Sequence, residues 1–331
     1  MKFLPSPETF LVEELPAYVP SGEGEHTYVW IEKRGLTTMD AVKKIARLLG
    51  VEARDIGYAG LKDRNAITRQ WLSLPRIAPE LAAAVAEPDL VVLEAKRHGN
   101  KLRTGHLRGN RFELVVTMAP DEEAGVRARL ASLAATGLPN RFGEQRFGAR
   151  GDNADAGLAI LRGERRERDH KLRKLLLSAA QSAVFNRALE LRAAGPGGLP
   201  AVRTGDVLQK VGSGGLFITD DPAVDQPRVD AGEIVPTGPL PGGREMEPPP
   251  GTAARAIEDE ALAAVGATRE DFERAGRDLP GARRPVLVPL TLGEPAVQPE
   301  PGHAGPDEVA LRIRFTLQAG SYATVVVAAL S

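Results

Sequence analysis

The chain has 331 residues, of which 42% are hydrophobic and 26% charged, which is typical of a globular protein long enough for about two domains. It contains no cysteine, which excludes disulfides and cysteine metal sites, and its five histidines show no metal-ligand spacing. No segment approaches the roughly 18 apolar residues that span a bilayer, and no signal-peptide pattern opens the chain, so we expect a cytoplasmic protein without a metal.

The first part of the chain mixes strand and helix patterns. β-Branched and aromatic residues predict strands over residues 9–15 and 27–32, near 56, and over 67–74, 90–95 and 112–117. Residues 38–49 read as a helix capped by Thr38 and ended by Gly50. Proline and acids at 120–123 favour a helix start there, because the macrodipole is positive at that end, and this helix runs towards Ala135.

The character of the chain changes from Gly137. Residues 169–194 predict a long helix with a core stripe made of Leu172, Leu175, Leu176, Ala179 and Ala183. Residues 195–251 are rich in glycine and proline and predict loops joining short strands, and strand patterns return at 285–292 and 309–317. We therefore expect one sheet domain built from residues 1–136 and 286–331, with residues 137–285 inserted as a second lobe.

Charge is segregated along the chain although the net charge is only −1. Residues 96–174 carry 18 Lys and Arg against 10 Asp and Glu, whereas residues 220–273 carry 13 acids against 4 arginines. The densest positive run consists of Lys96, Arg97, Lys101, Arg103, Arg108 and Arg111. It is either a solvated face or a surface that binds the phosphates of a nucleic acid, and the glycines within it favour the second interpretation.

Three consecutive charges, Lys62, Asp63 and Arg64, interrupt a strand pattern. One interpretation is a solvated turn, since aspartate is an ordinary turn residue. The other is a catalytic carboxylate that flanking cations keep ionised. Residues adjacent in a strand face opposite sides, so at most one of Lys62 and Arg64 is expected to contact Asp63.

Several enzyme classes find no support in the sequence. There is no glycine-lysine phosphate loop and no strand-GxGxxG-helix unit, and neither Ser213 nor Ser321 lies in a nucleophile elbow. A carboxylate glycosidase would need a second carboxylate near Asp63, such as Glu13 or Glu14.

The chain resembles the TruD-type tRNA pseudouridine synthases in eight blocks that occur in the family's order. They are PETFLVEE (7–14), GEGEHTYVWIEK (22–33), AGLKDRNAITRQ (59–70), NKLRTGHLRGNRFEL (100–114), GLPNRFGEQRFG (137–148), LLLSAAQSAVFN (175–186), TGPLPG (237–242) and AGSYAT (319–324). The resemblance implies an α+β fold, with a pseudouridine synthase-like mixed or antiparallel sheet, flanking helices and an inserted α+β TRUD lobe. It also implies that residues 322–330 are helical, although their valines read as a strand.

The resemblance further implies isomerisation of uridine 13 of tRNA to pseudouridine without a cofactor, a metal or an obligate protein partner. Asp63 matches the family's catalytic aspartate, and an aspartate suits a nucleophile that attacks the nucleotide and later leaves. Such an enzyme must flip its target base into a pocket. Phe10, Asn110 and Tyr322 match the family's substrate-contact positions. The weaker candidates are Lys62, Gln70, Phe112, Asn140 and Arg146.

The sequence departs from the family pattern at a few positions. Leu4 stands where a lysine is common, Thr9 where an aspartate is usual, and Arg141 where a tyrosine is common, while Ala328 and Ala329 replace an Arg-Glu pair. These departures leave a second hypothesis open, in which the chain is a catalytically silent RNA-binding or RNA-folding protein with the same fold.

Overall fold

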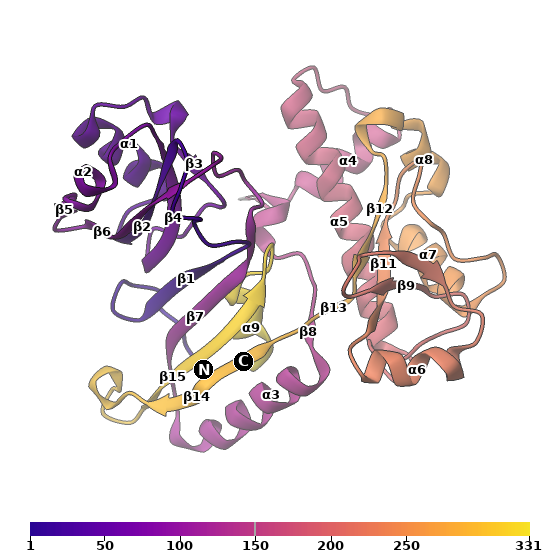
Figure 1. The fold of residues 1–331 in the computed structure, drawn as a ribbon. Coiled ribbons are helices and arrows are strands. Elements are labelled where there is room, and N and C mark those ends of the chain that lie inside the picture. The colour runs from indigo at the N-terminus through magenta and orange to yellow at the C-terminus, as the bar shows by residue number, and fades with distance from the viewer. Residues whose placement is uncertain (149) are drawn as a thin grey trace. The chain divides into compact units, whose positions relative to one another are not determined.

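The computed structural model describes residues 1–148 and 150–331, which divide into two compact units (Figure 1). The first unit comprises Met1–Ala135 and Pro289–Ser331, and the second comprises Thr136–Val288. Within this described part of the chain, no helix is both long and apolar enough to cross a membrane.

The first unit is built on a mixed sheet of nine strands that come from both ends of the chain. In spatial order the strands are β14 (Thr291–Pro299), β15 (Val309–Gln318), β7 (Leu107–Met118), β1 (Phe10–Pro16), β4 (Ile67–Pro75), β2 (His26–Arg34), β6 (Leu90–His98) and β5 (Ala86–Glu87), with β3 (Gly57–Tyr58) paired to β4. Only the pairing of β1 with β4 is parallel among these strands. The expected mixed sheet is confirmed.

The register of the sheet aligns one row of side chains across five strands. Lys33 on β2 is opposite Thr68 on β4, which is opposite Val12 on β1; Val12 is opposite Phe112 on β7, and Phe112 is opposite Phe315 on β15. Because side chains alternate between the two faces of a sheet, these five residues share one face. All five are buried.

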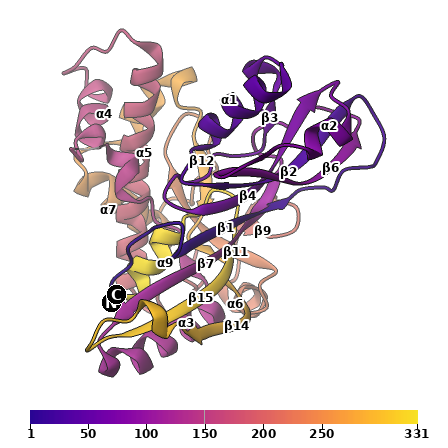
Figure 2. The ribbon, with the colours of Figure 1, turned by 90° about the vertical axis from the view of Figure 1, so that its left-hand side faces the viewer.

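Helix α1 (Thr38–Leu49) covers part of this face, over β2 and β4 (Figure 2). Its apolar side includes Ala41, Val42 and Ile45, which pack with Val29 and Leu72 of the sheet in one core cluster. The expected bounds are confirmed, and Gly50 ends the helix with a φ of 66°. The expected cap was wrong, because Thr37 caps the helix while the buried Thr38 hydroxyl bonds to Gln70.

The other helices of the first unit are α2 (Pro79–Ala83), α3 (Glu123–Thr136) and α9 (Ala323–Leu330). The 3₁₀ turn Pro120–Glu122 precedes α3, as the proline and acids of that segment predict. The valine-rich segment 323–330 is helical, as the family resemblance implies, with Val326 and Leu330 buried. Arg129 of α3 donates to the Leu330 carbonyl at 2.9 Å, which joins the end of α9 to α3.

The second unit contains a four-stranded sheet in the order β10 (Leu216–Ile218), β9 (Val207–Lys210), β11 (Ile234–Leu240) and β12 (Ala282–Pro285). A two-stranded pair, β8 (Leu138–Pro139) with β13 (Leu287–Val288), lies where the chain enters and leaves this unit. Its helices are α4 (Asn153–Leu161), α5 (His170–Ala194), α6 (Pro222–Asp230), α7 (Ala253–Ala264) and α8 (Arg269–Arg274).

Helix α5 confirms the long helix expected over 169–194, and Asp169 is its cap. The predicted core stripe of this helix was partly wrong. Leu176 and Ala179 are buried, but Leu172 and Leu175 remain 41% and 48% exposed because the first turns of α5 project beyond the core. The core of this unit instead joins α5 to α4, α7 and α8 through residues such as Leu158, Ala261 and Phe272.

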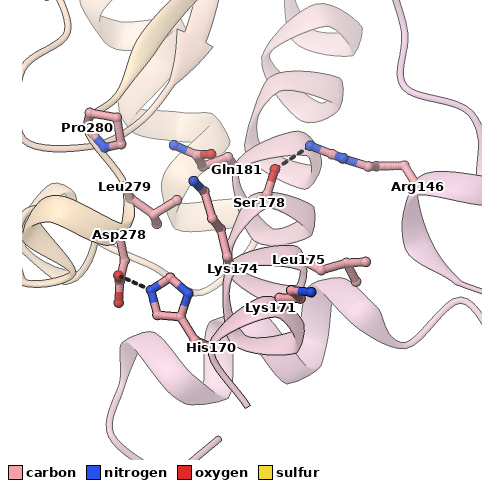
Figure 3. A pocket seen from close by; sticks show the side chains of 10 residues that line it. All are labelled: Arg146, His170, Lys171, Lys174, Leu175, Ser178, Gln181, Asp278, Leu279 and Pro280. Atoms are coloured by element: carbon pink, nitrogen blue, oxygen red, sulfur yellow. Dashed lines mark hydrogen bonds and ion pairs between the residues drawn. The ribbon is translucent and has the colours of Figure 1, made fainter. Parts of the chain in front are cut away.

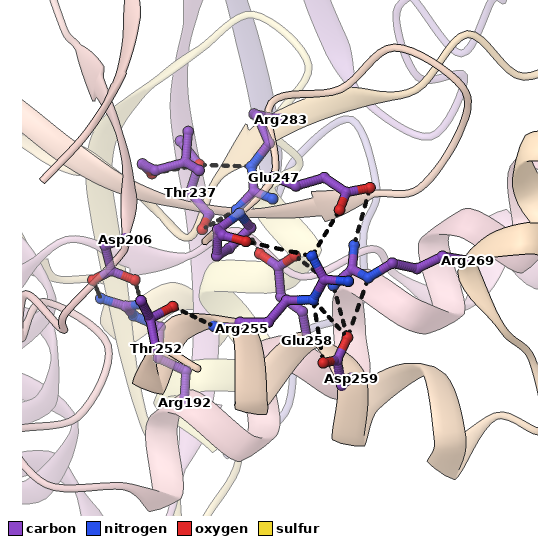
Figure 4. A network of polar contacts seen from close by, with 12 residues as sticks. Arg192, Asp206, Thr237, Glu247, Thr252, Arg255, Glu258, Asp259, Arg269 and Arg283 are labelled. Carbon is purple, nitrogen blue, oxygen red and sulfur yellow. Dashed lines mark hydrogen bonds and ion pairs between the residues drawn. The ribbon is translucent and has the colours of Figure 1, made fainter. Parts of the chain in front are cut away.

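The acidic segment 220–273 is partly neutralised inside the second unit by arginines (Figure 4). Glu258 accepts a hydrogen bond from the buried Arg283 at 2.7 Å and pairs with Arg269 at 3.4 Å. Arg192 and Asp206 form a second buried pair through two contacts of 2.7 Å each. Two-point pairing of this kind satisfies both groups and offsets the cost of burying their charges.

Candidate functional site

Asp63 lies in the segment that joins β3 to β4, residues 59–66, which we call the Asp63 loop. Its side chain is exposed and forms no ion pair or hydrogen bond within residues 1–148 and 150–331. The loop has no helical or strand structure, which agrees with a turn. The hydrogen bonds between its backbone and buried side chains, however, distinguish it from a simple solvated turn.

Three buried side chains hold the backbone of the Asp63 loop from beneath. Gln70 on β4 donates to the Gly60 carbonyl at 3.2 Å, and the Thr38 hydroxyl accepts from the Lys62 amide at 2.8 Å. Thr38 also donates to Gln70 at 2.9 Å, and Lys33 donates to the Asp63 carbonyl at 3.1 Å. Since each contact comes from a strand or helix of the core, the loop presents the carboxylate from a fixed backbone.

Lys33 is fully buried and has no carboxylate partner within ion-pair distance among the described residues. Its ammonium donates to the carbonyls of Leu36 and Asp63. Burial lowers the pKa of Lys33 to about 8, while the charge of Asp63 acts in the opposite direction. Lys33 therefore brings a positive charge close to Asp63 from the interior of the protein.

Lys62 pairs with Glu14 of β1 rather than with Asp63. Their side chains meet at 2.7 Å and both are buried. Burial raises the pKa of the Glu14 carboxyl, and the Lys62 ammonium and the Trp71 amide oppose that rise. Arg64, the other expected partner of Asp63, donates instead to the Gly35 carbonyl at 3.3 Å.

Neither Glu13 nor Glu14 offers a free second carboxylate beside Asp63. Glu14 is held by Lys62, and Glu13 pairs with Arg111 at 2.7 Å and with Arg69 at 3.4 Å. The glycosidase alternative therefore gains no support from this site.

Two buried polar atoms on the same face of the sheet have no hydrogen-bond partner among the described residues. They are Oγ1 of Thr68 and Oδ1 of Asn110. Asn110 is opposite Glu14 in the register of β1 and β7, and Thr68 is opposite Lys33. Because a buried polar atom without a partner costs free energy, two such atoms on one face of the sheet indicate a place where a ligand can supply the missing bond.

Phe10 and Phe112 belong to an aromatic cluster on this face. Their rings stack with centroids 6.3 Å apart, and Phe112 contacts Phe315 at 5.4 Å. Phe3 meets Phe10 edge to face at 5.4 Å. Both Phe10 and Phe112 are buried, so they form part of the apolar core.

Tyr322 is 62% exposed and lies at the residue before α9. The strand that precedes it, β15, pairs with β7 as far as Gln318 opposite Gly109, and the Ala319 amide donates to the Arg108 carbonyl. Tyr322 therefore follows the end of β15 that is paired with the Asn110 end of β7. Its hydroxyl has no partner within the described residues.

The structure places Asn140 and Arg146 in the second unit. Asn140 is buried and fixes β8 to β12, donating to the Pro285 carbonyl at 2.9 Å and accepting from Arg284. Arg146 donates to the hydroxyls of Ser182 and Ser178 on α5. Asn140 therefore has a structural role within that unit, and Arg146 lines a pocket there.

The departures from the family pattern have local explanations. Thr9 donates to the Leu4 carbonyl at 2.7 Å, so these two altered positions meet in one turn before β1. Arg141 pairs with Glu190 at 2.7 Å on the surface of the second unit. Ala328 is exposed and Ala329 half-buried on α9. In the part of the chain that the structure describes, none of these residues forms a hydrogen bond or an ion pair with the Asp63 loop.

The basic run lies on β6, β7 and the loop between them, because both strands extend further into it than the sequence predicts. Lys96 forms an ion pair with Glu94, and Arg111 forms one with Glu13. Lys101 donates to the Arg54 carbonyl. Within the described residues, Arg103 and Arg108 have no recorded side-chain partner and are exposed. These two cations are therefore available to bind phosphates.

Sequence reasoning missed two residues that shape this site, Lys33 and Thr38. Lys33 lies just beyond the strand predicted over 27–32, and Thr38 was interpreted only as a helix cap. A lysine at an inward position of a central strand was the available signal, because lysine is almost never fully buried unless its charge is satisfied. In the described part of the chain, no group of three or more His, Asp or Glu residues is arranged to hold a metal ion.

Comparison with solved structures supports the fold. A Methanosarcina mazei protein provisionally assigned as tRNA pseudouridine synthase D (TruD) superposes with a TM-score of 0.81, covering 97% of this chain and 91% of the other. The two sequences are 22% identical, so this likeness concerns the fold. The mixed sheet with flanking helices is thus an architecture that this chain shares with that structure.

Sequence comparisons identify the family. The family model for tRNA pseudouridine synthase D (TruD) matches residues 1–168 and 165–330. The tRNA pseudouridine synthase D of Anaeromyxobacter dehalogenans (strain 2CP-C) is 48% identical over 97% of this chain and 90% of its own length. The proteins of the same name from Thermus thermophilus and Geobacter metallireducens are 41% and 39% identical, each over 96% of this chain, with 85% and 92% of their own lengths covered. The chain belongs to the TruD family of tRNA pseudouridine synthases, which are isomerases.

Proposed function

We propose that this protein isomerises the uridine at position 13 of tRNA to pseudouridine, with Asp63 as the covalent nucleophile. The observation that carries the proposal is an exposed carboxylate on a loop whose backbone is held by Gln70, Thr38 and Lys33. We further propose that residues 1–136 and 286–331 form the catalytic domain, that residues 137–285 form the inserted lobe, and that the protein acts in the cytoplasm, where tRNA is its partner.

The reaction requires the protein to assist the breaking of one bond and the formation of another. The bond between N1 of uracil and C1′ of ribose must break, and a bond between C5 and C1′ must form, after which C5 loses its proton and N1 carries one. A carboxylate can attack the nucleotide, hold it through a transient covalent bond and then leave. Asp63 suits this role because its side chain is exposed and has no partner among residues 1–148 and 150–331, while its backbone is fixed.

A side-chain oxygen of Asn110 without a hydrogen-bond partner among the described residues supports recognition of the edge of a pyrimidine base. The Oδ1 atom of Asn110 is buried without a donor among the described residues. The N3–H group of a flipped uracil is a donor that would satisfy it, and satisfying a buried acceptor gives discrimination against bases that lack such a donor. We propose that Asn110 reads this edge of the base.

The aromatic residues have separate proposed roles. Phe10 and Phe112 stack within the core and would support the floor of the site, whereas Tyr322 is exposed and would contact the nucleotide directly. Arg103 and Arg108, which are exposed and unpaired within the described part of the chain, would bind phosphates of the tRNA, since such contacts dominate affinity for nucleic acids.

Mass-spectrometric mapping of tRNA with the wild-type protein and the Asp63→Asn variant tests the proposal. The wild type should convert uridine 13, and Asp63→Asn should form no pseudouridine while retaining tRNA affinity. Asp55→Asn is a matched control, because Asp55 is also exposed on the same unit without a recorded side-chain partner among the described residues, and it should stay active.

The outcomes separate the proposals. Turnover by Asp63→Asn would exclude Asp63 as the nucleophile, and conversion at another uridine would exclude position 13. Binding by the wild type without any new pseudouridine would indicate the catalytically silent RNA-binding protein instead.

A further inference from the structure

The second unit contains an open pocket of about 550 Å³ beside the first turns of α5 (Figure 3). One wall is a stripe of α5 that includes Lys171, Lys174 and Leu175, with Ser178 and Gln181 further along the helix. The opposite walls come from Arg146 and from residues 278–280. All these residues belong to the second unit, so the pocket is complete within it.

The pocket is positively charged. Lys171 and Lys174 have no ion pair within residues 1–148 and 150–331, and Arg146 binds only serine hydroxyls and an aromatic ring there. Among the described residues of the lining, Asp278 is the one acidic side chain, and it is already held by Arg173 at 3.0 Å and faces His170 at 3.6 Å. Three cations are therefore left to act on an incoming anion, with little opposition from Asp278.

The lining of the pocket also includes apolar side chains. Leu175, the residue after Lys174, is 48% exposed, and Leu279 and Pro280 also line the pocket. Exposed apolar side chains that are rimmed by cations suit a ligand with an anionic end and an apolar or stacking end. A nucleotide has both.

We propose that this pocket binds a nucleotide of the RNA substrate other than the isomerised uridine, with Lys171 and Lys174 on its phosphates and Leu175 against its base or ribose. The proposal rests on the proposed function, because it takes tRNA as the ligand. The volume favours a nucleotide over an isolated anion, since sites for small organic molecules measure roughly 300–1,000 Å³. Gln181, whose amide donates to the Pro241 carbonyl at 2.8 Å, closes the far end of the α5 stripe.

Fluorescence anisotropy with labelled tRNA across a salt series tests the pocket in the full chain. Lys171→Gln/Lys174→Gln should raise the Kd several-fold, by about ten-fold at the most, and reduce the slope of log affinity against log salt by about 1 to 2, since each lost phosphate contact removes about 0.7–0.9. KM for pseudouridine formation should rise with kcat unchanged. Lys171→Arg/Lys174→Arg keeps the charge and should bind like the wild type.

Lys43→Gln/Arg47→Gln is the matched control. It removes two exposed cations from α1 that have no ion pair in the described part of the chain. A wild-type Kd and salt slope for the Lys171/Lys174 variant would overturn the proposal, and so would an equal loss of affinity in the control. Circular dichroism before and after binding confirms that each variant is folded.

A second readout identifies the contact itself. Ultraviolet cross-linking of tRNA to the wild type, followed by peptide mapping, should recover peptides from residues 170–181, and their absence would contradict the proposal. Failure of the proposed function looks different. In that case the wild type would form no pseudouridine, while the anisotropy series would still report whether the pocket binds RNA.

Discussion

The Nζ atom of Lys33 lies 3.1 Å from the carbonyl oxygen of Asp63, and this hydrogen bond joins a fully buried ammonium to an exposed loop. No carboxylate balances the ammonium at ion-pair distance within the described residues. The lysine therefore carries a desolvation cost that a methionine of similar length would not carry. The hydrogen bond from Lys33 therefore holds the Asp63 loop in position at a cost in folding free energy.

Replacing Lys33 by Met should separate activity from stability. The fall of the Lys33 pKa from 10.5 to about 8 corresponds to a cost of about 3 kcal/mol, so the variant should be at least as stable as the wild type despite two lost hydrogen bonds. Without the tether, kcat should fall by about ten- to a hundred-fold, because small displacements of a catalytic group are costly. Chemical denaturation and single-turnover assays measure the two effects. Wild-type kcat in Lys33→Met would exclude a positioning role.

The same lysine predicts how stability depends on pH. Between about pH 8 and pH 10.5 the unfolded chain keeps a proton on Lys33 that the folded protein has released. The free energy of unfolding therefore rises with pH in this window through Lys33, by up to about 1.4 kcal/mol per pH unit, and the gain disappears as the pH falls through 8. Urea denaturation at several pH values should show this rise in the wild type relative to Lys33→Met. Parallel curves would contradict the prediction.

The buried pair of Glu14 and Lys62 should be costly to break on one side only. Glu14→Leu or Lys62→Met alone should lower the free energy of unfolding by about 3–5 kcal/mol, because each leaves a buried charge without its partner. Glu14→Leu/Lys62→Met should cost clearly less than the sum of the two single changes. A double-mutant cycle by chemical denaturation checks this, and strict additivity would show that the groups do not interact.

Gly109 is required by the close approach of β7 and β15. A Cβ at this position would lie 2.2 Å from the Leu317 carbonyl oxygen, so Gly109→Ala must push the strands apart next to Asn110. We expect a loss of about 1–3 kcal/mol of stability and a larger loss of activity. Gly99→Ala is the control, because no atom of the described residues would lie within 4 Å of the added Cβ. Equal melting temperatures for the two variants would contradict this expectation.

Arg103 and Arg108 should contribute to tRNA affinity through phosphate contacts. Arg103→Gln/Arg108→Gln should weaken binding and reduce the salt slope by about 1 to 2, as expected for one or two lost contacts. Arg111→Gln should have a smaller effect, since Arg111 is already paired with Glu13 at 2.7 Å. Anisotropy titrations across salt concentrations compare the variants. An unchanged slope in the double variant would place the tRNA elsewhere.

Local patterns predicted the first unit more fully than the second. Helix α1 has the expected bounds because its apolar spacing and Gly50 both act within a few residues. The expected strand over 285–292 is instead divided into β12, β13 and β14, with Pro289 in the interval between β13 and β14. Helices α4, α6, α7 and α8 were not predicted, because short helices among glycine and proline depend on tertiary packing.

The candidate site shows a similar division. Asp63 could be proposed from its charged neighbours and from the family blocks, but its attachments could not. Thr38, Gln70 and Lys33 are separated from the loop by up to 30 residues and meet it only when α1, β2 and β4 pack together. The ion pair of Lys62 with Glu14 likewise depends on the parallel pairing of β1 with β4, which the order of the strands in the sequence does not reveal.

The origin of the sheet from both chain ends bears on how the protein is made. Until β15 emerges from the ribosome, β7 has an unpaired edge, and unpaired edges are prone to join other chains. The inserted unit, Thr136–Val288, is continuous and can fold earlier, while the sheet that carries the Asp63 loop is still incomplete. Tyr322 is synthesised after both. A nascent chain thus acquires the proposed RNA-modifying site only after residues 309–322 have been synthesised, so chains released before that point should be inactive and prone to aggregate.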